Sequence, residues 1–339
     1  MGKGDKGPGV AKKVSWGILG CAGIAERALI PAIHGASNGR LLGIASRNSR
    51  KAKEWAARFD IPKVYADYAA LLDDPDIDAV YIPLPNHLHQ EWSVRSARAG
   101  KHVLCEKPMA MNAAEARKMA VAAAKAGVLL MEAFMYRFHP RTERAVRLLA
   151  SGAVGEVRSV RSVFTFLFDA ASDDYRWRPE SGGGSLFDVG CYPVSAARLV
   201  FGVEPVSVFA RARLHPQHRV DVEAEILLEF PGEKFASLGC GFESQFRSSL
   251  EIAGSEGRLS LERAFSAKHF DTEIRLMNGD RTRAIPFPAT DQYTCMIEHF
   301  GEGVLRGHPL RFQPDDAVAN MRILDAAFRS MRTGRPVRL

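Results

Sequence analysis

The chain has 339 residues, of which 46% are hydrophobic and 25% are charged, and its formal net charge is +7. This length suits two domains, and the composition is that of an ordinary globular protein. No apolar run approaches the roughly 18 residues of a membrane span, no Lys/Arg cluster interleaved with aromatic residues favours a nucleic-acid partner, and the N-terminal segment lacks the apolar core of a secretory signal.

Smaller features of the composition narrow the class of protein further. Residues 1–13 are rich in Gly and Lys, so we expect a disordered tail. The five cysteines are isolated and show no C-x-x-C spacing, which favours free thiols in a reducing cytoplasm. No His/Cys/Asp cluster has the spacing of metal ligands, so we expect no metal. We therefore expect a cytoplasmic protein whose partner is a small molecule, not a membrane or a nucleic acid.

The stretch 14–33 reads as a strand, a tight turn and the start of a helix. Residues 14–19 form a short apolar run typical of a buried parallel strand. A turn of small residues with the spacing G-x-A-x-x-A follows, and such a turn before a helix can bind the pyrophosphate of a dinucleotide. Its residues are Gly20, Cys21, Ala22, Gly23, Ile24 and Ala25. Because two of the three usual glycines are alanines, the turn alone is a weak signal.

Strand and helix patterns then alternate as far as residue 131. Ser49, Asn86 and Asn112 are the predicted N-caps of three helices. This alternation predicts an α/β dinucleotide-binding Rossmann domain, with a parallel doubly wound sheet, over residues 14–130. Ligands of such sheets bind beyond the C-terminal ends of the strands. The further strands are predicted at 40–46, 63–65, 79–82, 102–105 and 128–131, and the helices at 49–59, 68–72, 86–99 and 112–125.

The residues at those strand ends indicate which dinucleotide binds. Ser46 and Arg47 follow the second strand, where an NAD site usually has Asp or Glu. Arg47 offers a planar fork of donors that suits the 2′-phosphate of NADP, so we favour NADP over NAD. His87 and His89 lie near the same sheet edge and serve either a ligand or the polarity of a surface helix. The other candidate cofactor-binding residues at strand ends are Pro83, Leu84, Asn86, Glu106 and Lys107.

The second half of the chain, residues 131–339, changes to the period of β-strands. Alternating patterns predict strands from about residue 158 and over 222–230, 234–243, 250–253, 258–261 and 272–277. We expect an α+β domain with a large, open, mostly antiparallel sheet that binds substrate. Helices return at 292–305 and 315–331. One sheet face then meets helices, and the other meets a second subunit in a homodimer or homotetramer.

One predicted helix interrupts the strands of this half. Three glycines, residues 182–184, precede it and allow the backbone to approach another body closely. Asp188 and Tyr192 are four residues apart, so they share one face of the helix.

With these residues in hand, the chain resembles the glucose–fructose oxidoreductase/inositol dehydrogenase family, usually written Gfo/Idh/MocA. The matching motifs are GILGCAGIA at 17–25, AGKHVLCEKP at 99–108, MEAFMYRFHP at 131–140 and GGGSLFDVGCYP at 182–193. The resemblance covers nearly the whole chain. It implies an N-terminal Rossmann domain and a C-terminal open sheet that commonly makes dimers or tetramers.

The resemblance also implies roles for three residues. Lys107 matches the lysine that contacts the nicotinamide ribose and the substrate, and Asp188 matches an acidic residue that orients substrate hydroxyls. Tyr192 stands where many members, inositol dehydrogenases included, have histidine. A tyrosine there is similar to the sugar-oxidising and dihydrodiol-oxidising branches and to some deoxysugar ketoreductases, which puts an inositol substrate in doubt.

Hydride transfer between nicotinamide and a carbinol carbon requires a proton to move at the same oxygen. We predict that Tyr192 is the acid/base, that the Lys107 ammonium lowers its pKa, and that Asp188 orients the substrate. Arg176 and Trp177 precede the glycines and are predicted to line the site and meet the cofactor. Glu106 holds either Lys107 or the backbone, while Arg137 and His139 face substrate or close a domain seam.

The predicted function is NADP-dependent oxidation or reduction of a sugar or related polyol, with an aldose at C1 as the first choice. A ketoreductase of a nucleotide-linked keto-sugar and a trans-dihydrodiol dehydrogenase are alternatives within the same chemistry. A glycoside-cleaving enzyme that uses bound dinucleotide and a non-catalytic sugar-sensing regulator are alternatives from other classes. The complete Lys107, Asp188 and Tyr192 set argues against the regulator, and Tyr192 argues less firmly against glycoside cleavage.

Overall fold

The computed structural model describes residues 12–339, so most of the expected tail, residues 1–13, lies outside the described residues. The first half forms a six-stranded sheet in the order β3-β2-β1-β4-β5-β6. All of its strand pairs are parallel, as the alternating pattern predicts. The strands are β1 (Val14–Leu19), β2 (Gly39–Ala45), β3 (Lys63–Tyr65), β4 (Ala79–Ile82), β5 (His102–Cys105) and β6 (Leu130–Glu132).

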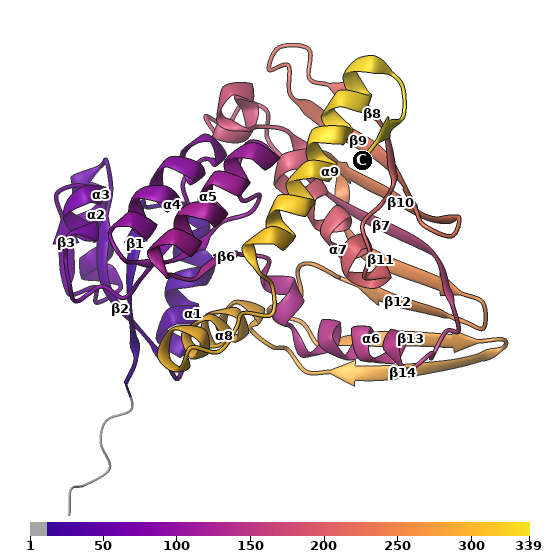
Figure 1. Cartoon of the computed structure of the whole chain (residues 1–339), viewed down its shortest axis with the longest axis horizontal. Coiled ribbons are helices and arrows are strands. Elements are labelled where there is room, and N and C mark those ends of the chain that lie inside the picture. Colours follow the sequence, from indigo (N-terminus) through magenta and orange to yellow (C-terminus); the bar gives the residue numbers. More distant parts are fainter. Residues whose placement is uncertain (1–11) are drawn as a thin grey trace, which may run out of the picture.

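Helices connect these strands in the way a doubly wound sheet requires. A π-helical turn at Ala25–Leu29 leads directly into the first of them. They are α1 (Ile30–Gly35), α2 (Ser49–Arg58), α3 (Tyr68–Leu72), α4 (His89–Arg98) and α5 (Ala113–Ala126). Figure 1 shows this half of the molecule in indigo and purple, with α4 and α5 side by side.

Two of the three predicted helix caps are wrong. The α2 cap is Asn48, whose side chain accepts from the Lys51 amide, and not Ser49. The Asn86 side chain caps nothing, because its amide instead donates to the Gly182 carbonyl 96 residues away. Asn112 does cap α5, by accepting from the Glu115 amide. A local cap signal thus failed where a tertiary contact competed for the side chain.

The second half forms a nine-stranded sheet in the order β14-β13-β12-β11-β7-β10-β9-β8-β15. Only the β10–β7 pair is parallel, so the expected mostly antiparallel sheet is confirmed. The strands are β7 (Val157–Leu167), β8 (Ser207–Leu214), β9 (Asp221–Phe230), β10 (Lys234–Gly241), β11 (Glu243–Gly254), β12 (Arg258–Glu262), β13 (Thr272–Asn278), β14 (Arg281–Phe287) and β15 (Val337–Arg338). Sequence patterning missed β8, β14 and β15, of which β14 and β15 lie at the two sheet edges.

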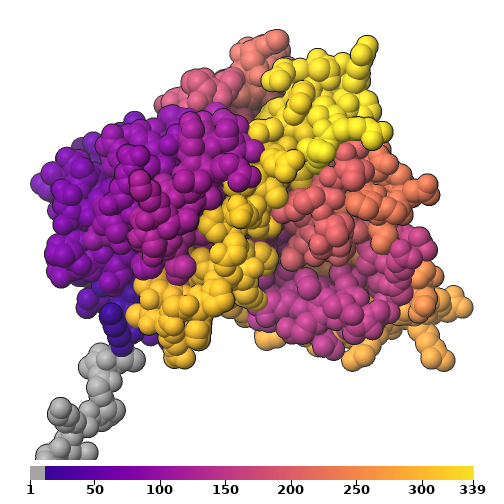
Figure 2. All heavy atoms as spheres, in the orientation of Figure 1, coloured from indigo at the N-terminus to yellow at the C-terminus, as the bar shows by residue number. Residues whose placement is uncertain are grey.

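Helices cover one face of this sheet and also join the two halves. They are α6 (Pro140–Ala150), α7 (Cys191–Phe201), α8 (Gln292–Arg306) and α9 (Pro314–Thr333). The sequence analysis missed α6, although His139 and Pro140 form a recognisable cap and first turn. Helix α8 packs against α1, and α9 packs against both α5 and β8. Figure 2 shows the yellow and gold C-terminal helices lying between the two halves on this face.

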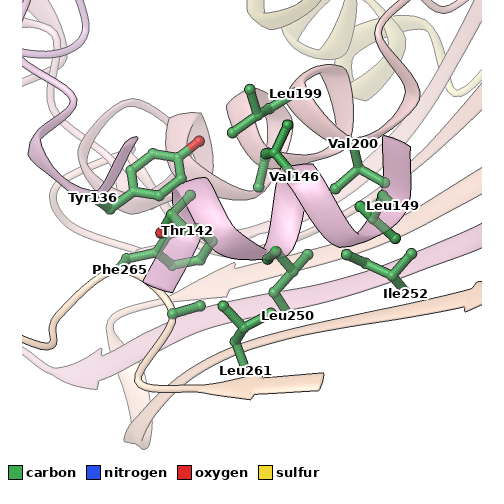
Figure 3. A pocket seen from close by; sticks show the side chains of 13 residues that line it. Tyr136, Thr142, Val146, Leu149, Leu199, Val200, Leu250, Ile252, Leu261 and Phe265 are labelled. Atoms are coloured by element: carbon green, nitrogen blue, oxygen red, sulfur yellow. The ribbon is translucent and has the colours of Figure 1, made fainter. Parts of the chain in front are cut away.

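The packing between α6, α7 and strands β11 and β12 leaves one small apolar cavity of about 20 Å³. Figure 3 shows its lining, which includes Leu149, Leu250 and Leu261. A gap of this size and polarity is an ordinary packing defect of the core, and it is too small and too apolar to bind a substrate.

Some expectations concern features outside the two sheets. All five cysteines are free thiols, as expected. Across residues 12–339 no helix combines the length and the apolar character needed to cross a membrane. In the same part of the chain, no three His, Cys, Asp or Glu side chains gather as metal ligands would.

Candidate active site

A cleft of about 440 Å³ lies where the C-terminal ends of β1, β4 and β5 face the start of α7. Both halves of the chain contribute to its walls. Of the predicted site residues it brings together Ala22, Gly23, Ile24, Pro83, Leu84, Asn86, Glu106, Lys107, Arg176, Asp188 and Tyr192. Its remaining lining residues are Arg27, Pro85, Met135, Phe164, Asp174, Tyr175, Val189, Phe265, Ser266 and Tyr293.

The small-residue turn after β1 forms one end of this cleft. Gly20 has a φ of 111°, a conformation that favours glycine, and a Cβ there would lie 3.0 Å from the Leu84 side chain. The amides of Ala25 and Glu26 both donate to the Ala22 carbonyl and begin the helical turn. The backbone therefore has the shape of a pyrophosphate-binding turn, with Ala22 and Gly23 at the cleft.

Arg27 is a residue of this turn that the sequence analysis missed. Its guanidinium lies over Gly23, where an added Cβ would come within 2.9 Å of Nη1. Arg27 also lines the cleft, so a cation stands beside the helix start at which a diphosphate would bind. The sequence offers one indication of this role, namely that Arg27 is the fourth residue after Gly23. An arginine at that spacing is not specific to a diphosphate site.

The end of β2 gathers polar and cationic groups next to the same turn. The Lys51 ammonium donates to the Cys21 carbonyl at 2.9 Å. Burial raises the pKa of Tyr68, and the nearby Arg47 guanidinium opposes that rise. The Tyr68 hydroxyl would lie 3.6 Å from a Cβ on Gly20. Ser46 is buried here and Arg47 is exposed, so the cation expected to meet the 2′-phosphate stands beside the turn and Tyr68.

The opposite end of the cleft holds a buried cluster of one carboxylate and two cations. The Lys107 ammonium donates to the backbone carbonyl of Asp188 at 2.7 Å and to its Oδ1 at 3.0 Å. Arg176 Nε lies 2.9 Å from Asp188 Oδ2. Burial alone would raise the pKa of Asp188, but Arg176 and Lys107 outweigh it and lower that pKa to about 2. Asp188 is therefore a carboxylate at any physiological pH.

Tyr192 does not have the electrostatic environment that the sequence analysis predicts. The Lys107 ammonium lies over its ring, 5.2 Å from the centroid, and not beside its hydroxyl. That hydroxyl instead contacts the Met135 sulfur at 3.6 Å. Burial raises the pKa of Tyr192 well above its ordinary value, and the nearby acidic groups of Tyr293 and Glu106 add to the rise. The predicted lowering of this pKa by Lys107 is wrong for this structure, in which Tyr192 is a neutral phenol.

Glu106 supports the turn that carries Lys107. Its carboxylate accepts from the Tyr81 hydroxyl and, at 3.2 Å, from the backbone amide of Lys107. Of the two alternatives for Glu106, the structure favours the backbone, because its carboxylate accepts from the Lys107 amide. The Lys107 ammonium donates to Asp188 instead.

Two predicted cofactor-binding residues lie behind the cleft wall. His89 is fully buried, and its ring nitrogens lie 2.7 Å and 2.9 Å from the carbonyls of Leu84 and Pro108. Burial lowers its pKa to about 4, so a neutral ring ties the two turns together. Trp177 is buried, donates to the Asp169 carbonyl and stacks on Phe168. Neither side chain lines the cleft.

The residues with open roles also lie away from the cleft. His87 is exposed. His139 caps α6 by accepting from the Arg141 amide, and Arg137 binds Ser195 and Asp316 in a buried seam. Of the two readings for Arg137 and His139, the structure favours the seam.

Asp221, on β9, holds the start of the segment that carries Asp188. Its Oδ2 accepts from the Leu186 amide at 2.6 Å and the Ser185 hydroxyl at 2.8 Å. These bonds satisfy the first turn of a π-helix, Leu186–Gly190, that runs into α7. Burial raises the pKa of Asp221 to about 6. No sequence pattern pointed to Asp221, because it is 33 residues from Asp188 in the chain.

Two further phenols line the end of the cleft that holds Asp188. Burial raises the pKa of both Tyr175 and Tyr293, which face Lys107 from different elements. Tyr293 belongs to α8, far from every motif in the sequence. Aromatic side chains on β7 and after β12, Phe164 and Phe265, enclose the Tyr192 ring at centroid distances of 5.3 and 5.4 Å.

The chain is similar to known proteins over nearly its whole length. Residues 14–134 match an oxidoreductase family with an NAD-binding Rossmann fold, and residues 142–260 match the GFO/IDH/MocA C-terminal domain. An NADP-linked D-xylose 1-dehydrogenase of Haloferax volcanii is 40% identical over 96% of this chain and 99% of its own length.

Solved structures match over the same range. A 3-ketoreductase from Actinomadura kijaniata, in complex with NADP and TDP-benzene, has a TM-score of 0.89 and 34% identity over 94% of this chain and 98% of its own. An aldose–aldose oxidoreductase from Caulobacter crescentus, complexed with glycerol, has a TM-score of 0.90 and 31% identity over 97% of this chain and all of its own. Because both domain models and full-length relatives match, the chain belongs to the GFO/IDH/MocA family of oxidoreductases.

Proposed function

We propose that this protein transfers a hydride between NADP and a carbinol or carbonyl carbon of a sugar or related polyol, with an aldose at C1 as the first candidate. The observation that carries the proposal is the cluster of Lys107, Asp188 and Tyr192 in one cleft with the dinucleotide turn. The three relatives named above act on sugars or bind NADP by their names, which supports the same class.

The residues present fit NADP. The turn at 20–25 and Arg27 suit the pyrophosphate, and Ser46, Arg47 and Lys51 suit the 2′-phosphate. When bound, NADP supplies the hydride acceptor, or NADPH the donor. No carboxylate occurs from Ser46 to Lys53, where an NAD site would need one, so we propose NADP and not NAD.

The chain's own side chains handle the substrate oxygen. In oxidation, the carbinol carbon gives up a hydride and its hydroxyl gives up a proton, which leaves a carbonyl. Asp188 accepts from a substrate hydroxyl and so orients the ring, while the Lys107 ammonium stabilises negative charge on the reacting oxygen. In reduction, the neutral Tyr192 phenol gives its proton to the oxygen of the forming alcohol. In oxidation, Tyr192 takes the proton of the carbinol hydroxyl only as the phenolate, after its own proton has passed to solvent.

The raised pKa of Tyr192 favours its role as the proton donor in reduction over its role as the base in oxidation. A neutral phenol is a ready proton donor to a developing alkoxide but a weak base, so the resting site is set to protonate a carbonyl oxygen. Reduction of a keto-sugar is therefore the second candidate function, and the neutral phenol is the observation that favours it. A trans-dihydrodiol dehydrogenase would use the same residues.

We also propose a homodimer or homotetramer through the uncovered face of the nine-stranded sheet, in the cytoplasm. Helices cover the opposite face. The uncovered face carries exposed Leu167, Leu227 and Phe235 on β7, β9 and β10, and such patches are typical of interfaces. Sedimentation at micromolar concentration is expected to show no monomer, and a monomeric species there would contradict the proposal.

A spectrophotometric screen tests the function. NADP⁺ is offered with aldoses, polyols and dihydrodiols, and NADPH is offered with keto-sugars, and the absorbance of NADPH is followed. We expect turnover with at least one sugar, and a lower KM for NADP⁺ than for NAD⁺. No turnover in either direction with any sugar or polyol would contradict the proposal.

A further inference from the structure

Two phenylalanines and an arginine that contacts both of their rings lie beside the end of the cleft that holds Tyr192. Phe246 on β11 and Phe270 after β12 are 45% and 43% exposed. The Arg263 guanidinium lies over both rings, 5.3 Å from the Phe246 centroid and 3.7 Å from that of Phe270. We call these three residues the rim cluster.

The rim cluster is continuous with the cleft. Phe246 contacts Phe164, a cleft residue, with centroids 6.4 Å apart. Two residues beyond Arg263 in the chain, Phe265 lines the cleft and stacks on Phe164 at 5.4 Å. The Phe265 amide donates to the Ser248 hydroxyl of β11, which fixes the loop on the sheet. A substrate that extends outward past Phe265 therefore meets the rim cluster.

Within residues 12–339, the Arg263 guanidinium makes neither an ion pair nor a hydrogen bond. No carboxylate in this range lies within the 4.0 Å of an ion pair from it, and none of its guanidinium donors has a protein acceptor there. By contrast, Lys268 in the same loop is paired with Asp291 at 3.0 Å. Contact with two rings restricts the side chain while it leaves the fork of donors available, and such a fork suits an oxyanion.

The backbone of Arg263 adds a second, independent observation. Its φ is 50°, which is unfavourable for a residue with a side chain. Buried Arg141 fixes this conformation by donating to the carbonyls of Glu262 and Arg263 at 2.7 and 2.8 Å. The fold thus maintains a strained position that presents a cation at the mouth of the cleft.

We propose that the rim cluster binds a phosphate group attached to the substrate, with Arg263 as the phosphate ligand and the two phenylalanines as flanking surfaces. This inference rests on the proposed function for the reacting end of the same substrate. The shared chemistry is a phosphate ester, from either an aldose phosphate or a nucleoside diphosphate joined to a sugar. Stacking of a base on an exposed ring would favour the second source.

The first test measures turnover. The rates with glucose and with glucose 6-phosphate are compared for the native enzyme, Arg263→Gln and Arg258→Gln, where Arg258 is an exposed arginine at the opposite end of β12. We expect Arg263→Gln to lower kcat/KM about tenfold or more for the phosphorylated substrate, with the unphosphorylated substrate and the Arg258 control unchanged. An equal effect on both substrates, or on neither, would overturn the proposal.

The second test needs no turnover, so it separates this inference from the proposed function. Binding of dTDP, glucose 6-phosphate and inorganic phosphate to the NADPH-loaded protein is measured by calorimetry. We expect the esters to bind the native protein and to lose about tenfold in affinity in Arg263→Gln. Tighter binding of dTDP identifies a nucleotide source, and tighter binding of the sugar phosphate identifies the other. Unchanged binding in the variant overturns the proposal even if the enzyme oxidises sugars.

A second variant guards against misfolding. Arg263→Gly removes the charge and relieves the positive φ together. It is expected to be at least as stable as the native protein and to show the same loss of phosphate affinity. Retained affinity in this stable variant would likewise overturn the proposal.

Discussion

Two aspartates in this protein, the buried Asp188 and the half-buried Asp316, have similar partners and different surroundings. Asp188 lies between Lys107 and Arg176, and Asp316 lies between Arg137 and Arg198. In each case the paired cations outweigh burial and lower the pKa of the carboxyl. The chemistry of an ion cluster therefore does not by itself distinguish a reacting site from a structural one.

What differs is the space that each cluster faces. The Asp188 cluster opens onto the cleft with the dinucleotide turn. Among residues 12–339, the ammonium of its lysine donates hydrogen bonds to Asp188 alone. The Asp316 cluster borders a smaller hollow of about 210 Å³, whose lining includes no residue of the dinucleotide turn. It ties α7 and α9 to the segment before α6, where Ser195 accepts from Arg137 and Glu204 pairs with Arg198. We infer that the Asp188 cluster acts on the substrate and that the Asp316 cluster stabilises the packing of α7 and α9.

The largest expected effect is a loss of kcat on substitution of Tyr192, compared with Tyr136, a second buried tyrosine that contacts the Asp316 region. Tyr192→Phe should lower kcat by about 100- to 10,000-fold, because the proton donor is removed. The melting temperature should hardly change, since the lost contact is a long one to a thioether. Steady-state rates and thermal unfolding measure the two quantities.

The matched control is Tyr136→Phe. Its ring lies 5.9 Å from that of Tyr192, and its hydroxyl bonds Ser195 in the Asp316 region. This variant should lose roughly 1 kcal/mol of stability and keep its kcat. If the two variants lost equal activity, the division into a reacting and a structural region would be wrong.

Arg137→Met tests the structural cluster from the other side. It leaves the half-buried Asp316 with Arg198 as its only remaining cation, so we expect the unfolding free energy to fall by up to about 3–5 kcal/mol in denaturant titrations. The folded fraction should retain native kcat. Arg275→Gln, which breaks an exposed pair with Glu273, should cost at most about 1 kcal/mol. A stable Arg137 variant with impaired chemistry would reverse the assignment.

Arg47→Ala tests the binding of the cofactor, and Arg47 belongs to neither ion cluster. We expect the Kd for NADPH to rise about tenfold or more while that for NADH changes little, because only NADPH has the 2′-phosphate. Equal weakening for the two cofactors in fluorescence titrations would contradict the role given to Arg47.

An effect that depends on pH concerns Glu132, which lies between the two regions. Its carboxylate accepts from the Met109 amide of the Lys107 turn and is influenced by Arg137. Burial, its largest influence, raises its pKa to about 7, so the folded state holds the proton more tightly than the unfolded chain. Unfolding free energy should therefore fall as pH rises from about 4.5 to 7, by at most about 1.4 kcal/mol per pH unit.

Glu132→Gln should remove this contribution and keep the acceptor for Met109. Denaturant titrations of both proteins over the same pH range measure the difference. A difference that stays constant with pH would show that Glu132 does not titrate there.

The sequence predicted the elements whose signals are local. The first six strands, the Asn112 cap and the sharing of one face by Asp188 and Tyr192 follow from hydrophobic period, cap chemistry and spacing. Residues that act through tertiary contact were invisible. Asp221 and Tyr293 reach the site from distant elements, and Asn86 looks like a cap until Gly182 is seen beside it.

The electrostatics of the site were the least predictable part. A lysine near a tyrosine is expected to lower its pKa, but whether the ammonium meets the hydroxyl or the ring depends on a few ångströms. Here it meets the ring and Asp188. Burial then decides the protonation state of Tyr192, and burial depends on Phe164, Phe265 and Phe134, which come from three separate segments.

Isotope transfer tests the central proposal most directly. The native enzyme is incubated with NADP⁺ and an aldose deuterated at C1, and the nicotinamide product is examined by mass spectrometry. We expect deuterium in the NADPH formed by the native enzyme and by Tyr136→Phe, with almost no product from Tyr192→Phe. NADPH without deuterium, or undiminished labelled product from Tyr192→Phe, would contradict hydride transfer from C1 at this site.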